Sequence, residues 1–176
     1  MERYPDYETY RALYARYHKR GTDQLVQLLQ PLKGMSVVDI CGGDGRLSLK
    51  ALESDPQSVL LVDQDPAMIP DDLWNDERID ITLENVESFL TDLVAGSERF
   101  DRIVSQQAVN YWLNEDTAKL VAQALAPGGI FAFNTFNRKP PKKPRTLEYM
   151  LDGHTFVEVS WLVGDQVHHI QVRDGL

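Results

Sequence analysis

Residues 37–48 read VVDICGGDGRLS, and this stretch decides the fold. Its first four residues are typical of a short buried strand, and the glycines after them indicate a tight turn. Gly43 and Gly45 can adopt positive φ and let the backbone approach a ligand closely. A helix expected from Arg46 would then begin with N–H groups that point at the ligand. The stretch therefore predicts a nucleotide-type turn between a strand and a helix.

Buried strands and amphipathic helices alternate after this turn. Helical spacing is found at 86–93 and again from Asn114 to Leu125, and Pro127-Gly128-Gly129 is expected to end the second of these helices. Strands that alternate with helices of roughly ten to fifteen residues indicate right-handed crossovers and a parallel sheet covered on both faces. The predicted fold class is α/β, with a doubly wound, Rossmann-like, mostly parallel sheet. The further strands are predicted at 58–62, 79–83, 100–105 and 130–135.

Other patterns flank this core. Tyrosines at 7, 10, 14 and 17 recur at helical spacing, and Thr22 is expected to cap a second helix. The basic, proline-rich run at 138–145 can form neither helix nor central strand. Short turns at 152–153 and 164–165 then predict an antiparallel meander of three strands. We expect a single domain, 1–176, made of N-terminal helices (1–34), the core (35–137), the basic loop (138–145) and the meander (146–176).

Composition narrows the classes of function. The formal net charge is −9, from 18 basic and 27 acidic residues, which disfavours a nucleic-acid partner. The single cysteine excludes an intrachain disulfide, and we find neither a signal core nor a membrane-spanning run. We therefore expect a cytoplasmic protein that has no membrane partner. The four histidines are not paired at metal-ligand spacing, so no metal is expected.

The glycine spacing alone leaves two classes of nucleotide ligand open. It also approximates the fingerprint of NAD-dependent oxidoreductases, in which an acid about 20 residues further on binds the ribose. Here, however, four carboxylates would surround the turn, and their field is unfavourable for a diphosphate. S-adenosylmethionine has no phosphate, and its sulfonium and ammonium groups suit an acidic pocket. The four residues are Asp39, Asp44, Asp63 and Asp65.

The order of the motifs resembles the class I S-adenosylmethionine-dependent methyltransferases of small-molecule type. Residues 37–48 are similar to the first motif of that family, and Val59–Ile69, in which Asp63 closes the strand, is similar to the second. Residues 85–87 stand where the family often has an aspartate against the adenine, and 100–105 and 125–129 resemble the segments around its fourth and fifth strands. Two departures are Cys41 in place of the usual glycine and Asn85 in place of aspartate.

The resemblance implies a cofactor and the residues that bind it. The cofactor would be S-adenosyl-L-methionine, with S-adenosyl-L-homocysteine as product. Asp39 would orient the ammonium, Gly43 and Gly45 would give room to the methionine part, Asp63 would accept both ribose hydroxyls and Asn85 would meet the adenine edge. The remaining expected cofactor-binding residues are Cys41, Gln64, Val86, Ser105 and Gln106.

No catalytic residue is identified from the sequence. Methyl transfer by in-line displacement mainly needs alignment of the acceptor and exclusion of water. Gln106 and Gln107 are candidates because open sheets bind ligands at the carboxyl ends of their strands, although both also fit as loop polar groups. Tyr14 and Tyr17 could close the pocket, as N-terminal helices do in related enzymes, although packing on the core also explains them. His168 is a candidate general base.

The leading hypothesis is methyl transfer to an N or O atom of a small metabolite. Two alternatives stay open, an NAD-dependent oxidoreductase and a catalytically inactive methyltransferase-like binding module. Family members continue past the fifth strand into a helix and an antiparallel strand pair. Either the last two predicted strands serve as that pair, or the meander is a cap and an exposed sheet edge favours a homodimer.

Overall fold

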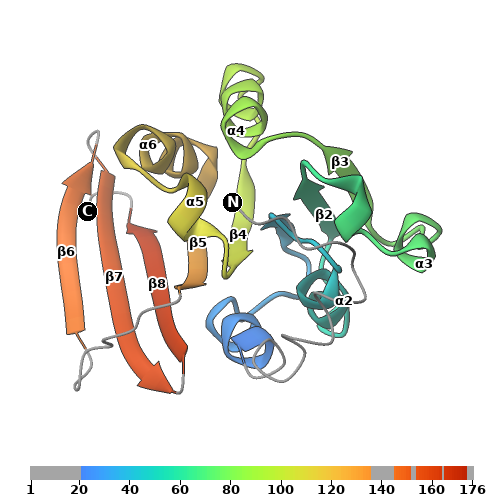
Figure 1. Cartoon of the computed structure of the whole chain (residues 1–176). Helices are drawn as coiled ribbons and strands as arrows, with labels where there is room; N and C mark the ends of the chain where they lie inside the picture. The colour runs from blue at the N-terminus through green and yellow to red at the C-terminus, as the bar shows by residue number, and fades with distance from the viewer. Residues whose placement is uncertain (1–20, 136–144, 152–153, 164, 174–176) are drawn as a thin grey trace.

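The computed structural model describes residues 21–135, 145–151, 154–163 and 165–173 (Figure 1). Five strands form its parallel core in the order β3-β2-β1-β4-β5, and every neighbouring pair among them is parallel. This confirms the predicted doubly wound, Rossmann-like sheet. The strands are β1 (Ser36–Ile40), β2 (Ser58–Asp63), β3 (Asp80–Leu83), β4 (Phe100–Gln106) and β5 (Leu125–Thr135).

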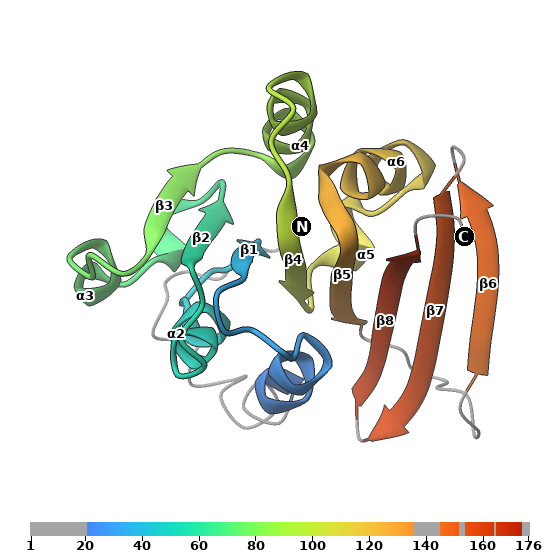
Figure 2. The same ribbon diagram turned by 180° about the vertical axis from the view of Figure 1, so that it is seen from behind.

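Helices cover both faces of this sheet. Figure 2 shows α4 (Val86–Ala95) and α6 (Glu115–Ala124) on the face opposite α2 (Arg46–Leu52). The helix at 21–28 lies on the α2 side, where its leucines join a buried cluster with β1 and β2. Because both faces are covered, β1 and β4 each contain four consecutive buried residues, which is why their sequences do not alternate. Three short helical segments complete the core: η1 (Pro66–Met68), α3 (Asp71–Trp74) and α5 (Val109–Trp112).

Three further strands follow in the C-terminal part. They are β6 (Arg145–Leu151), β7 (His154–Val163) and β8 (Asp165–Arg173), and they continue the sheet in the order β8-β7-β6. β8 runs antiparallel to β5, with Ile130 opposite Gln171 and Thr135 opposite Gln166. The tyrosines at 7, 10, 14 and 17 and most of the basic run lie outside the described residues. None of the described helices is long and apolar enough to cross a bilayer.

Two local predictions are wrong. Thr22 does not cap a helix, because the helix already includes residue 21 and the Thr22 hydroxyl donates across the fold to Oε1 of Gln106 at 2.9 Å. Residues 127–129 do not end α6 either, because the helix stops at Ala124 and pairing with β4 starts at Leu125. The register shifts before Ile130, and Gly128 has a φ of 72°. The Pro-Gly-Gly segment therefore forms an irregularity within β5.

Candidate active site

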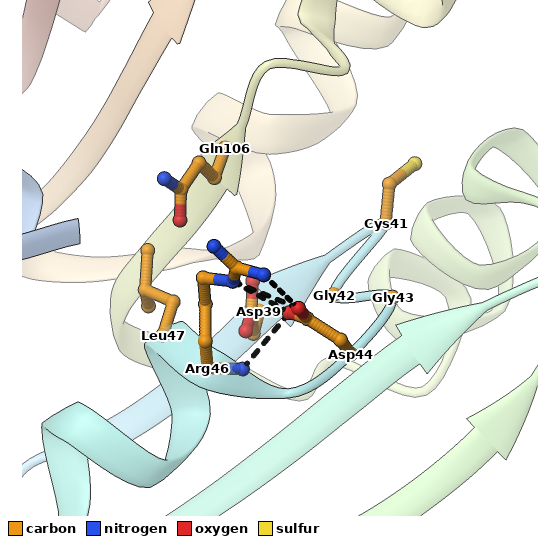
Figure 3. Close-up of a pocket in the computed structure, with 8 residues that line it drawn as sticks. All are labelled: Asp39, Cys41, Gly42, Gly43, Asp44, Arg46, Leu47 and Gln106. Atoms are coloured by element: carbon orange, nitrogen blue, oxygen red, sulfur yellow. Dashed lines mark hydrogen bonds and ion pairs between the residues drawn. The ribbon is translucent and has the colours of Figure 1, made fainter. Parts of the chain in front are cut away.

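A pocket opens at the carboxyl ends of β1 and β4 (Figure 3). The chain leaves β1 for β2 on one side and returns through β4 on the other, so this is the topological switch point where open α/β sheets bind ligands. Strand β1 and the glycine turn supply most of the wall, α2 supplies two side chains and β4 supplies one. The lining residues are Asp39, Cys41, Gly42, Gly43, Asp44, Arg46, Leu47 and Gln106.

The glycine turn is fastened to the end of β2 by Asp63. The Gly43 N–H donates to Oδ2 of Asp63 at 3.0 Å, and the Asp65 N–H donates to Oδ1 at 3.0 Å. Burial is the main cause that raises the pKa of Asp63 above its ordinary value. Each carboxylate oxygen has two acceptor sites, so these hydrogen bonds leave capacity for a hydroxyl donor. Asp63 thus shapes the glycine turn, and its predicted contact with a ribose stays a prediction.

Asp39 supplies a buried carboxyl group to the pocket. Asp39 is 1% exposed, and its Oδ2 accepts a hydrogen bond from the Ser48 hydroxyl at 2.7 Å. Within the described residues, Oδ1 has no hydrogen-bond partner. Burial raises the pKa of Asp39 to about 7, against the opposing effect of the Ser48 hydrogen bond. A buried carboxyl with one unsatisfied oxygen is suited to a cationic donor that enters the pocket.

Cys41 stands in a backbone conformation that normally requires glycine. Its φ is 57°, in the left-handed region, and an L residue there costs roughly 1–2 kcal/mol. Burial, followed by the charges of Asp63 and Asp39, raises the pKa of the Cys41 thiol to about 12. The thiol is therefore neutral at physiological pH and is a lining group rather than a nucleophile.

Asp44 and Arg46 form an ion pair in the pocket wall that the sequence analysis did not predict. The Arg46 Nε donates to both carboxylate oxygens of Asp44, at 2.9 and 2.8 Å, and Nη2 donates to Oδ2. The sequence analysis counted Asp44 only as a local charge. The sequence signal for this ion pair was the spacing of Asp44 and Arg46, two opposite charges two residues apart at the start of α2.

The ends of β4 and β5 bring several amides and hydroxyls together. Gln106 lines the pocket, and Gln107 adopts a φ of 58° while its N–H donates to Oδ1 of Asn134 at 2.6 Å. Asn134 is 0% exposed and was missed, although it is a polar residue that directly follows the apolar run 130–133. In the described part of the chain, three atoms of this cluster have no hydrogen-bond partner: Ser105 Oγ, Gln107 Oε1 and Asn134 Nδ2.

Other predicted site residues lie outside the pocket wall. Asn85 caps α4, with its Oδ1 accepting from the Ser88 N–H at 3.0 Å, while Val86 packs into the core. Gln64 is exposed beyond β2, and Ser105 is buried within β4. Tyr14 and Tyr17 lie outside the described residues, and His168 is placed only by its backbone, opposite Phe133. The adenine-binding and acceptor roles of these residues stay predictions.

Chemically, the pocket can hold a ligand that is cationic on one side and anionic on another. Two carboxyl groups and one guanidinium line it, next to a glycine turn that allows close backbone approach. The described residues contain no group of three His, Cys, Asp or Glu side chains placed to hold a metal ion.

Comparison with known proteins shows similarity in sequence. A family model described as "Methyltransferase domain" matches residues 37–129. The ubiquinone biosynthesis O-methyltransferase of Cereibacter sphaeroides is 32% identical over 114 residues, which are 62% of this chain and 44% of that protein. The chain thus spans less than half the length of this curated relative.

Solved structures give the same fold. The N-methyltransferase NodS from Bradyrhizobium japonicum, in complex with S-adenosyl-L-homocysteine, superposes with a TM-score of 0.62 at 13% identity, covering 90% of this chain and 88% of that one. An S-adenosylmethionine-dependent methyltransferase from Mesorhizobium loti gives a TM-score of 0.54 at 23% identity, covering 84% and 72%. At these identities the likeness shows the fold. The family match, which includes the glycine turn, favours the methyltransferases over the dinucleotide-binding oxidoreductases.

Proposed function

This chain belongs to the methyltransferase domain family of class I S-adenosylmethionine-dependent enzymes, and on that premise we propose that it transfers a methyl group to an N or O atom of a small metabolite. The observation that carries the proposal is the unsatisfied Oδ1 of buried Asp39, beside a glycine turn that Asp63 fastens in place. A cation that donates hydrogen bonds would satisfy that oxygen, and the ammonium of S-adenosyl-L-methionine is such a group.

The residues present fit this cofactor. Asp39 would orient its ammonium, the backbone at Gly43 and Gly45 would approach its methionine part, and Asp63 would accept the ribose hydroxyls. When bound, the cofactor supplies an electrophilic methyl group on a sulfonium. The chain's own residues would then hold the acceptor in line with that methyl group and exclude water.

The acceptor side of the proposal rests on the amides at the ends of β4 and β5. Gln106 lies in the pocket wall, and Gln107 and Asn134 adjoin it with buried amide atoms that lack partners in the described part. Neutral amides can orient a hydroxyl or an amine without adding charge. The named activities of two similar proteins, an O-methyltransferase and an N-methyltransferase, support either acceptor atom.

Two measurements test this function. Calorimetry should show binding of S-adenosyl-L-homocysteine and none of NAD, and the reverse result would refute the proposal. Labelled S-adenosylmethionine should then pass its methyl group to members of a panel of phenols, carboxylates and amines. Tight binding without transfer to any acceptor would favour a catalytically inactive binding module instead.

The three C-terminal strands are part of the proposed domain. We propose that β6, β7 and β8 form an antiparallel meander, and the antiparallel pairing of β6 with β7 and of β7 with β8 supports it. Slow amide exchange along residues 166–171 is expected, and fast exchange throughout would contradict it.

We also propose a cytoplasmic protein with a small-molecule acceptor and no nucleic-acid or membrane partner. A homodimer formed through a free sheet edge is measurable by light scattering.

A further inference from the structure

The side-chain amide of Asn134 uses its oxygen and leaves its nitrogen without a partner. Asn134 is 0% exposed near the end of β5, and it lies beside Gln106 in the register with β4. Its Oδ1 accepts from the Gln107 N–H at 2.6 Å, and because an N–H can only donate, this contact fixes which end of the amide is the oxygen. In the described part of the chain, Nδ2 has no hydrogen-bond partner. Asn134 thus holds a buried donor in a fixed orientation.

This donor lies where the helix at 21–28 meets the pocket wall. A Cβ added at Gly21 would lie 2.7 Å from Nδ2 of Asn134 and 3.2 Å from Nε2 of Gln106, so both amides border the space beside Gly21. Gln106 also lines the cofactor pocket, as Figure 3 shows, and this places the space beside Gly21 next to the pocket. The absence of a side chain at Gly21 therefore leaves room for the amide donor at this place.

The polar groups near this donor are uncharged. They are the hydroxyl of Thr22 and the amides of Gln106, Gln107 and Asn134. A carboxylate bound here would lose its hydration without gaining a cation, because Arg46, the only cationic side chain among the described residues that line the pocket, is paired with Asp44. An ammonium has no lone pair with which to accept from an amide N–H. A hydroxyl or carbonyl oxygen has lone pairs and no charge, so it is the group that fits.

We propose that Nδ2 of Asn134 donates a hydrogen bond to an uncharged oxygen of the methyl acceptor, an inference that rests on the proposed function. The acceptor is then a molecule with a hydroxyl or carbonyl group at or next to the methylated atom. Its oxygen supplies the partner that the buried donor lacks. Oδ1 has a separate task, because its contact holds Gln107, with a φ of 58°, in the turn after β4.

Four acceptors that offer the same phenol group test the predicted class. In 2-hydroxybenzamide and 2-hydroxybenzyl alcohol the neighbouring group has an uncharged oxygen, whereas 2-hydroxybenzoate and 2-hydroxybenzylamine carry a carboxylate and an ammonium there. With labelled S-adenosylmethionine, kcat/KM should be at least roughly tenfold higher for the first two. Equal or better methylation of a charged member overturns the inference and leaves the proposed function intact. So does methylation of none of the four by a protein that methylates other compounds.

Asn134→Asp separates the two amide atoms, because aspartate keeps an oxygen for the Gln107 N–H and loses the Nδ2 donor. With the best uncharged acceptor, its KM should rise roughly tenfold, while kcat and the affinity for S-adenosyl-L-homocysteine stay within about twofold of wild type. Asn114→Asp is the matched control. At that position, the cap of α6, the side-chain oxygen accepts from backbone N–H groups, so KM should not change.

Asn134→Asp buries a carboxylate, and this can prevent folding. Asn134→Ala removes the donor without adding a charge, and it should raise KM at least as much. An unchanged KM in a folded variant that lacks Nδ2 overturns the inference. A rise in KM with an equal loss of S-adenosyl-L-homocysteine affinity also overturns it, because Asn134 would then act only through the turn. If the wild-type protein binds no S-adenosyl-L-homocysteine, the proposed cofactor is wrong and the acceptor contact is wrong with it.

Discussion

The Ser48 hydroxyl donates to Oδ2 of Asp39 at 2.7 Å, while Oδ1 of the same carboxyl has no hydrogen-bond partner in the described part of the chain. One hydrogen bond does not compensate for the burial of a charge, so the pKa of Asp39 is raised to about 7. The neighbouring carboxylates of Asp44 and Asp63 raise it further in the same direction. Asp39 therefore changes charge within the physiological range of pH.

Cofactor affinity should depend on pH because of this titration. An ammonium binds the charged form of Asp39, so the affinity for S-adenosyl-L-homocysteine should rise with pH through about 7. Between pH 6 and pH 8 the charged fraction rises roughly tenfold, and the affinity should follow. Calorimetry at a series of pH values measures this. Asp39→Asn should bind S-adenosyl-L-homocysteine weakly, with an affinity that does not change with pH. A tenfold rise in affinity between pH 6 and pH 8 that persists in this variant would assign the titration to another group.

The same carboxyl should lower the stability of the protein as pH rises. Its pKa is higher in the folded state than the ordinary value of 3.8, so the folded state holds the proton longer than the unfolded state. The stability contributed by the protonated form is present below pH 3.8 and is lost as pH rises towards 7, by roughly 4 kcal/mol at most. We expect denaturant unfolding at pH 5 and pH 8 to show that the unfolding free energy of Asp39→Asn, relative to that of the wild type, is higher at pH 8 than at pH 5. An equal difference at both pH values would contradict the shift.

The two glycines of the turn should differ in their tolerance of a side chain. Both have positive φ, 49° at Gly43 and 67° at Gly45, so alanine is strained at either position. A Cβ at Gly43 would meet nothing within 4 Å, whereas one at Gly45 would lie 2.3 Å from Cδ2 of Leu73. Gly43→Ala should cost roughly 1–2 kcal/mol of unfolding free energy, and Gly45→Ala should cost at least 1 kcal/mol more because Leu73 must move. If the two variants lose the same unfolding free energy in chemical denaturation, Leu73 in α3 moves aside at no cost and the predicted difference is wrong.

The strands of the parallel core were predictable from the sequence because the central ones are buried on both faces. Residues 37–40 of β1 are buried without a break for that reason, and the glycine turn that follows them has a strong local signal. The irregular start of β5 was not predictable, because the register of β4 decides it and local turn chemistry does not. Thr22 was misjudged for the same kind of reason, since its partner Gln106 is 84 residues away in the chain.

Within the site, the residues next to the glycines were predictable and those reached across the sheet were not. Asp39 is the last residue but one of β1 and Asp63 is the last residue of β2, so their positions follow from the strand ends. Asn134 acts through the backbone of Gln107, and that contact exists only because β4 and β5 are neighbours. Its signal, a polar residue directly after an apolar run of the strand, indicates a buried polar contact without identifying the partner.

Arg102 should be important for stability although it does not line the pocket. It is 6% exposed, its Nε donates to the carbonyl oxygen of Leu29 at 2.6 Å and its Nη2 donates to that of Pro31 at 3.1 Å. The guanidinium thus ties the segment after the helix at 21–28 to β4. A lysine ammonium lacks the planar fork needed to reach both carbonyls, so Arg102→Lys should lower the unfolding free energy by roughly 2–4 kcal/mol.

Arg99→Lys is the matched control for that substitution, because Arg99 is exposed and donates only to the adjacent carbonyl of Glu98 in the described contacts. It should change the unfolding free energy by less than about 0.5 kcal/mol. The helix at 21–28 carries Thr22, whose hydroxyl holds Gln106 in the pocket wall. Loosening that helix in Arg102→Lys should therefore also weaken S-adenosyl-L-homocysteine binding by a few fold. If Arg102→Lys unfolds like Arg99→Lys, the two carbonyl contacts do not hold the helix in place.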